Sequence, residues 1–132
     1  MHRCLCIALM VLSVAGGAIR TLGHHSLFAE FDMKKPVKLT GTISQVDWGN
    51  PHALLFLDVA SGAKAKALTW VVQLPGPNTF ARNGWRREPF RYGIVVTVSG
   101  YASKDGSRQA AALDVMASDG RKLFSAVTNP GE

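Results

Sequence analysis

The stretch that decides the fold is residues 37–48, VKLTGTISQVDW. Apolar or small residues at positions 37, 39, 41 and 43 alternate with polar ones, which predicts a strand with one face toward the core and one toward water. At Val46 and Trp48 the apolar residues change parity. Because a shift of one residue would otherwise turn the core face outward, we predict a β-bulge or sharp bend near Ser44–Gln45.

Four further strands are predicted downstream of this bent strand. They cover residues 53–59, 68–74, 94–101 and 110–116, and residues 122–126 have the character of a last short strand. A short helix is predicted over residues 78–83, because Pro77 suits the first turn of a helix and Gly84 suits its end. No internal repeat or linker divides this part of the chain.

The order of these elements, three strands, one helix and two strands, is that of an OB-fold. A long, bent first strand is also what that partly open barrel requires. We therefore predict a mostly β fold, a small OB-fold-like five-stranded barrel with one short helix between strands three and four. A small antiparallel sandwich is the competing architecture, and the same hydropathy permits it.

The beginning of the chain is typical of a secretory signal peptide. A basic start is followed by an apolar run, Cys4–Ala15, which is too short to span a membrane as a helix. Cleavage is predicted after Ala18 or after Gly23. With residues 1–23 removed, residues 24–132 form a single domain with an N-terminal arm (24–36) and a loose tail (127–132). We expect a periplasmic protein with no transmembrane span in its mature form.

Composition narrows the classes of function. Both cysteines lie inside the predicted signal, so the mature chain has neither a disulfide nor a thiol nucleophile. The full chain has 15 Lys and Arg against 9 Asp and Glu, and removal of Arg3 and Arg20 with the signal leaves the mature chain basic. This charge favours anionic partners such as phospholipid head groups, polysaccharides or small anions, and the alternative is that it only keeps the protein soluble. Nucleic acid is not expected as a partner in a periplasm. No glycine-rich phosphate loop, Gly-x-Ser-x-Gly motif or paired acids are visible, so we expect no enzyme activity.

Histidines are the candidate metal ligands. The three in the predicted mature chain are His24, His25 and His52. Imidazole suits copper and zinc, and an N-terminal amine exposed by cleavage near Gly23 would add a ligand for Cu(II). His52 completes such a site if the arm folds back beside the first turn. The alternative is that His24 and His25 are a polar start to the chain and that His52 is a turn residue.

A second candidate site is the loop between the first two predicted strands. In OB-like barrels this loop and the one between strands four and five frame the ligand. Here the first loop supplies Trp48, Asn50 and His52, and the second supplies Lys104 and Arg108. Aromatic side chains beside polar loop tips can stack on flat ligands or sugars. The structural alternative is that Trp48 plugs the end of the barrel and Asn50 caps the turn.

A third candidate is a cluster of arginines with aromatic neighbours. It comprises Arg82, Arg86, Arg87 and Arg91, with Trp85 and Phe90 between them. Such a cluster can touch a phosphate-rich surface, although a solvated face with its tryptophan packed inward has the same pattern. It supports the alternative function, an interaction protein that docks on an anionic surface or an envelope protein.

The sequence also resembles a family of small exported bacterial proteins, the domain-of-unknown-function family 6152. The resemblance rests on HHSLFAEFD (24–32), on residues 41–52, and on the later GW, GY and DGR pieces. Its most specific parts are the paired histidines and the W-x-N-P-H stretch, residues 48–52. It implies export, a mature start near His24 and a domain that reaches about Phe124, and it implies no activity. The leading hypothesis is a periplasmic, non-enzymatic binding module for an unknown small ligand or for a metal such as copper or zinc.

Overall fold

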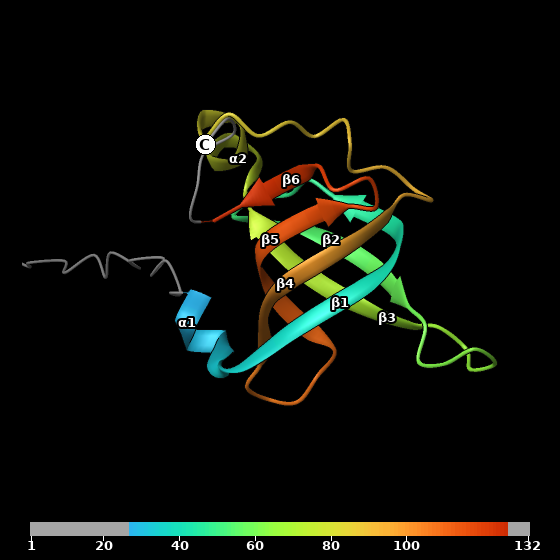
Figure 1. Cartoon of the computed structure of the whole chain (residues 1–132). Helices are drawn as coiled ribbons and strands as arrows, with labels where there is room; N and C mark the ends of the chain where they lie inside the picture. Colours follow the sequence, from blue (N-terminus) through green and yellow to red (C-terminus); the bar gives the residue numbers. More distant parts are fainter. Residues whose placement is uncertain (1–26, 127–132) are drawn as a thin grey trace, which may run out of the picture.

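The computed structural model describes residues 27–126, which form two short helices and six strands (Figure 1). In chain order these are α1 (Leu27–Glu30), β1 (Phe31–Asp47), β2 (His52–Val59), β3 (Leu68–Pro75), α2 (Pro77–Arg82), β4 (Val95–Ser103), β5 (Gln109–Ala117) and β6 (Lys122–Ser125). The predicted helix over residues 78–83 is confirmed as α2, and its position between the third and fourth strands is the one that the OB-like fold requires.

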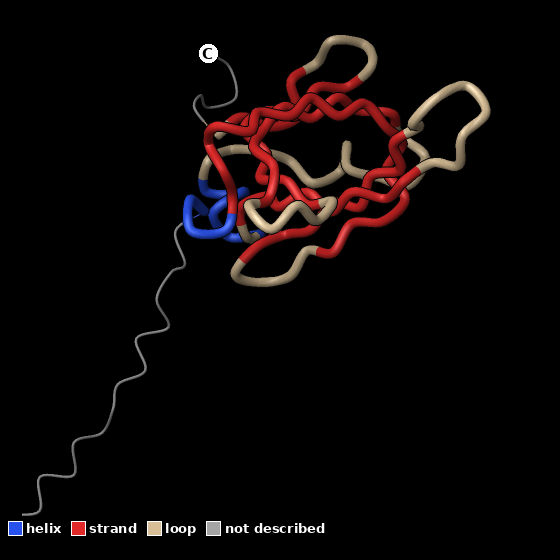
Figure 2. The backbone as a smooth tube through the Cα atoms, turned by 90° about the horizontal axis from the view of Figure 1, so that it is seen from below, coloured by secondary structure: helices blue, strands red, loops and turns tan. Residues whose placement is uncertain are grey.

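The strands form a closed ring, which Figure 2 shows from below. The later half of β1 pairs with β2 and its earlier half pairs with β4, both antiparallel. β3 pairs with β2, and β5 pairs with β4. A short parallel pairing of β3 with β5 closes the ring, and β6 extends it beside β5. The mostly β, OB-like prediction is confirmed, with a sixth strand in addition to the five predicted.

The bend predicted in the first strand is present. The pairing of β1 with β2 changes register between Ile43 and Gln45, which leaves Ser44 as the extra residue of a bulge. Ile43 is fully buried before the bulge and Val46 packs against the core after it. Nearby, a Cβ on Gly41 would lie 2.5 Å from the carbonyl oxygen of Asp58, so only glycine lets the two strands approach this closely. The change of parity in the sequence therefore marks the place where β1 leaves β4 and joins β2.

The start of the domain differs from the prediction. Residues 31–36, predicted as part of an arm, belong to β1, and Phe31 is buried and pairs with Ser103 of β4. The single helical turn α1 that precedes it was not predicted, because four residues carry too little periodicity to show a helix. The predicted signal peptide (1–23), His24, His25 and the predicted tail (127–132) lie outside the described residues. None of the helices in residues 27–126 is long and apolar enough to cross a membrane.

Candidate functional site

A cavity of about 550 Å³ lies between the turn after β1, the end of β3 and helix α2. Its inner wall is apolar and consists of the buried side chains of Leu74, Ala112 and Phe124. Its polar lining residues are Asn50, His52, Gln73, Asn78, Thr79 and Arg82. An apolar wall with a few polar groups around it is the usual composition of a small-molecule site.

The cavity lies where the parallel pairing that closes the strand ring ends. The parallel pairing of β3 with β5 ends at Gln73 and Ala111. The next residues, Leu74 and Ala112, face the gap instead of continuing that pairing, and both line the cavity. Helix α2 begins at Pro77, directly after β3, so it stands at the side of this gap. The end of a short parallel ladder thus leaves room for a ligand next to the core.

His52 is placed at this cavity by strand pairing. It is the first residue of β2 and lies opposite Pro75 of β3. Gln73 lies two residues earlier on β3, so it shares one face of the sheet with Pro75 and lies diagonally across from His52. Gln73, a polar residue within the apolar second half of β3, is a ligand candidate that the sequence interpretation missed. Its place between Val72 and Leu74 was the available signal.

The short helix α1 lies against the same side of the sheet. The side-chain amide of Gln73 donates a 3.4 Å hydrogen bond to the carboxylate of Glu30. The Lys104 ammonium donates to the carbonyl oxygen of Ala29 at 3.2 Å, and the Lys104 backbone N–H donates to Glu30 at 3.0 Å. A cation at the C-terminal end of a helix also interacts favourably with its dipole. These contacts hold α1 beside β3.

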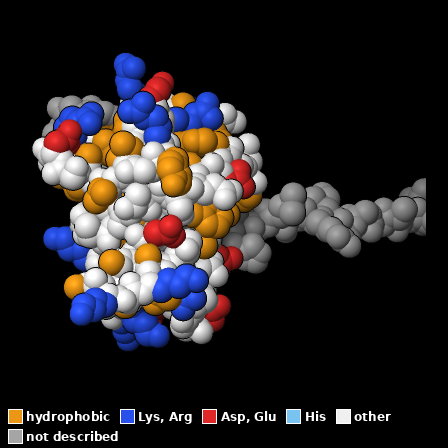
Figure 3. All heavy atoms as spheres, turned by 90° about the vertical axis from the view of Figure 1, so that its right-hand side faces the viewer, with side chains coloured by type: hydrophobic (Ala, Val, Ile, Leu, Met, Phe, Trp, Pro, Cys, Tyr) orange, Lys and Arg blue, Asp and Glu red, His pale blue; other side chains and the backbone are white. Residues whose placement is uncertain are grey.

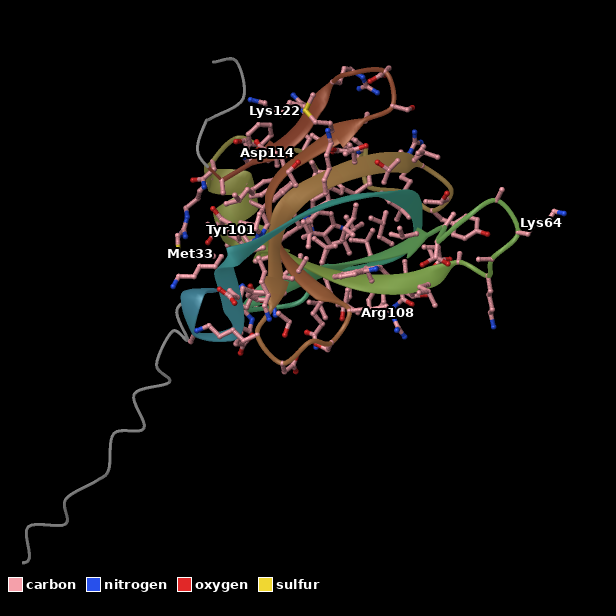
Figure 4. The ribbon with its side chains drawn as sticks, turned by 60° about the horizontal axis from the view of Figure 1, so that its bottom comes forward. Met33, Lys64, Tyr101, Arg108, Asp114 and Lys122 are labelled. Atoms are coloured by element: carbon pink, nitrogen blue, oxygen red, sulfur yellow. The ribbon has the colours of Figure 1, made fainter. Side chains whose placement is uncertain are left out.

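The two loops predicted to frame one ligand site lie at different places. Asn50 and His52 line the 550 Å³ cavity, whereas Lys104 lines a second cavity of about 430 Å³ with Glu30 and Phe31. Arg108 lines neither of these two cavities, and its exposed side chain points away from the strands (Figure 4). The structure therefore brings together Asn50 and His52 but leaves Lys104 and Arg108 apart from them.

Trp48 belongs to an aromatic cluster at the end of the ring. Its indole lies 5.3 Å from the ring of Phe80 and 5.8 Å from that of Phe90, measured between ring centroids. Phe80 in turn stacks on Phe124 at 5.6 Å. The guanidinium of Arg87 covers the outer side of Trp48, 5.4 Å from its centroid. Trp48 does not line the cavity beside His52, so these contacts match the structural alternative, in which it plugs the end of the barrel.

The predicted arginine cluster is exposed but divided. All four guanidinium side chains are exposed. Arg82 lines the cavity beside His52, Arg87 covers Trp48, and Arg86 lines a different cavity. Trp85 and Phe90, the aromatic residues between them, are buried in the core, as the solvated-face alternative predicts. The arginines therefore do not line a single cavity.

The loop after β4 is organised around one carboxylate. Asp105 accepts hydrogen bonds from the Ser103 hydroxyl, from the Ser107 hydroxyl at 2.6 Å and from the Ser107 backbone N–H at 2.9 Å. These bonds, that from Ser103 first, lower the pKa of Asp105 from 3.8 to about 2. They favour the charged form because each donor is best satisfied by a carboxylate. Asp105 thus holds the loop that carries Lys104.

Within residues 27–126 no three histidine, cysteine or acidic side chains are grouped as metal ligands. His52 is the described member of the predicted metal site, and His24 and His25 lie outside the described residues. The prediction of a three-histidine site therefore remains a prediction.

Comparison with known proteins gives a family but no activity. A family model described as a family of unknown function (DUF6152) matches residues 10–112. A search of the curated proteins found no match. Among solved structures, the chain is similar to the crystal structure of a mitochondrial single-stranded DNA-binding protein from S. cerevisiae. The identity is 11%, the match covers 70% of this chain and 99% of that one, and the TM-score is 0.46.

Proposed function

Since the chain belongs to the DUF6152 family of unknown function, its role has to be inferred from its site, and we propose that it is an exported, non-enzymatic binding module of the periplasm. Its ligand occupies the cavity beside His52. The observation that carries this proposal is the cavity itself, which has a volume of about 550 Å³, a buried apolar wall and a polar rim. Small-molecule sites typically measure about 300–1,000 Å³ and have this composition.

The rim favours a ligand with hydrogen-bonding groups. His52 can donate or accept, Asn50 and Gln73 can do both, and Arg82 supplies positive charge. Arg82 is partly oriented, because its Nη2 donates a 3.2 Å hydrogen bond to the hydroxyl of Thr79 on the same helix. No paired acids or activated nucleophile accompany these groups at the rim, which supports binding without turnover.

A divalent metal, copper above all, is the ligand that the histidines favour. His52 supplies one imidazole at the rim, and His24 and His25 supply two more if they reach it. The contact of Gln73 with Glu30 fixes where α1 lies relative to the cavity. Residues 27–30 form α1, so the link from Leu27 back to His25 is two residues long and spans at most about 7 Å when extended. The proposal requires His25 to approach the rim within that reach, and cleavage near Gly23 would add an α-amino ligand for Cu(II).

Metal titration of correctly processed protein tests this proposal. Cu(II) and Zn(II) are titrated into protein purified from the periplasm, after its intact mass has shown a start at or near His24. Matched variants are His24→Ala, His25→Ala and His52→Ala, with Gln45→Ala as an exposed control outside the cavity. A folded site predicts that binding weakens at least tenfold in His52→Ala and in one of the arm variants, and that Gln45→Ala binds normally.

The other outcomes are equally informative. Binding that is lost in the arm variants but kept in His52→Ala would place the metal on the terminal peptide alone. Equal, weak binding by all variants would end the metal proposal. The cavity is then tested with small polar organic compounds, followed by NMR of the amides of residues 50–52 and 73–82. If none of these compounds causes a specific shift of these amide signals, the proposal of a binding module is contradicted as a whole.

Docking on an anionic surface or an envelope protein is a second candidate. The observation in its favour is the exposure of Arg82, Arg86, Arg87 and Arg91 on one segment of the chain. It predicts co-sedimentation with anionic vesicles that falls with rising salt, because exposed charges are screened. Binding that persists in His52→Ala would separate this function from the cavity.

A further inference from the structure

Trp85 carries a buried donor with no acceptor. Its side chain is 7% exposed, and its Nε1 is the one buried side-chain polar atom that lacks a hydrogen-bond partner in the described part of the chain. The indole N–H can only donate, and when it is buried it usually has an acceptor. A native structure rarely leaves such a group unpaired, so the unpaired donor indicates a missing acceptor.

A cavity lies next to Trp85. The residue lines a cavity of about 360 Å³ together with Arg86, Arg121 and Lys122. Two distant segments build it: the loop after α2 supplies Trp85 and Arg86, and the turn before β6 with its first residue supplies the other two cations. Figure 3 shows Lys and Arg side chains at the top of the molecule, the end where Figure 1 places α2 and β6, and others at its bottom.

The charged residues that line this cavity are all cations. Asp119 pairs with Arg121, whose Nε lies 2.7 Å from its carboxylate, and this contact lowers the pKa of Asp119 and keeps it ionised. Asp119 does not line the cavity. Glu88 lines a neighbouring hollow of about 250 Å³, which Arg91 also lines. Three cations and no carboxylate line the cavity beside Trp85, so the missing acceptor should be anionic.

We propose that this cavity binds a phosphate group, with the Trp85 indole N–H, the Arg86 and Arg121 guanidinium groups and the Lys122 ammonium as its donors. Guanidinium groups match the geometry of phosphate oxygens and form charge-assisted hydrogen bonds with them. A metal cation would be repelled here, and an apolar ligand would leave the indole donor unpaired. The site is separate from the cavity beside His52 and does not depend on the function proposed for that cavity.

The core holds the indole of Trp85 in place. Its ring packs against Phe124 with 5.9 Å between centroids and an angle of 64° between planes. The Trp85 backbone N–H is bonded to the carbonyl oxygen of Phe80 at 3.1 Å. A donor fixed by the core loses little conformational freedom when a ligand binds, which favours binding.

NMR of the ¹⁵N-labelled protein tests the site directly. The chain has three tryptophans, so Trp48 and Trp70 serve as internal references for the indole N–H signal of Trp85, which Trp85→Phe assigns by its loss. Inorganic phosphate is added at constant ionic strength with sodium chloride. The expected result is a saturable shift of the Trp85 indole signal alone. Lys122→Gln should weaken binding at least fivefold, whereas Lys64→Gln should not change it, because Lys64 and Lys122 lie far apart (Figure 4).

The source of the phosphate is decided with vesicles. Phosphatidylglycerol vesicles that bind the protein, phosphatidylcholine vesicles that do not, and competition by inorganic phosphate would together identify a lipid head group. Phosphate binding without vesicle binding would identify a soluble phosphorylated compound. The proposal is overturned if the indole signal follows ionic strength only. It is also overturned if Lys122→Gln and Lys64→Gln behave alike, or if neither phosphate nor vesicles move the signal because water is the acceptor.

Discussion

Gly76 lies directly against Pro51: a Cβ atom on Gly76 would come within 2.5 Å of the Pro51 carbonyl oxygen. The two residues belong to the connection between β3 and α2 and to the turn between β1 and β2. Both line the cavity beside His52, so their close approach determines its shape. Gly76 is not among the glycines with a positive φ, so its backbone conformation does not require a glycine. The glycine is needed because the two backbone segments lie too close together for a Cβ atom.

We expect Gly76→Ala to destabilise the fold by about 1–3 kcal/mol, the usual cost of forcing an extra methyl group into a packed site. Its backbone neighbours can move only with the turn or the helix. Gly49→Ala is the matched control, because its added Cβ would lie 3.6 Å from the nearest atom, an ordinary contact. Urea unfolding measures both variants. Equal stability of the two would contradict the close packing of these segments.

Phe80→Ala should have the largest effect on stability. Phe80 is 0% exposed and contacts the rings of Trp48, Phe90 and Phe124 at the end of the strand ring. Removing a buried phenyl ring costs about 3–5 kcal/mol. The control is Tyr92→Ala, since Tyr92 is 83% exposed and should change stability by less than about 0.5 kcal/mol. Thermal unfolding that ranks the two variants the other way would rule out the aromatic cluster as part of the core.

Asp105 should contribute a pH-dependent stability. Its pKa falls from 3.8 to about 2 on folding, so its contribution is present above pH 3.8 and is lost as the pH falls toward 2. We expect Asp105→Asn to have a lower thermal midpoint than the natural protein at pH 6, with the difference shrinking toward pH 2. Asp32→Asn is the control, at an acid with no such set of serine donors. A difference that stays constant between pH 6 and pH 2 would contradict the role of ionised Asp105.

Lys104→Met should loosen α1. The substitution removes the hydrogen bond from the ammonium to Ala29 but keeps the backbone bond to Glu30. The expected loss is about 0.3–1 kcal/mol, as for a cation at the end of a helix. Faster amide exchange at residues 29–31 checks it, with Lys38→Met as an exposed control on β1. Unchanged exchange in both variants would show that Lys104 does not hold the helix.

The local signals predicted the fold well because each reports on a few adjacent residues. The change of parity between Ile43 and Val46 marked the bulge, and Pro77 and Gly84 marked the ends of the region that contains α2. The predicted start of the first strand at Val37 was wrong for the same reason, since β1 begins at Phe31. Residues 31–36 have no alternating apolar pattern and four of the six are exposed, and Phe31 and Pro36 at their two ends pair with β4, a partner that no local pattern reveals.

By itself, the sequence determined the β-rich fold, the bend in its first strand and the candidate role of His52, since periodicity and residue chemistry are properties of short segments. Only the tertiary structure decided which candidates meet. It separated Lys104 and Arg108 from His52 and placed Gln73 and Arg82 beside it. It also brought Trp85 to Arg121 and Lys122. The physical reason is that both cavities form where strands and loops distant in the chain pack together, and such contacts depend on closure of the ring.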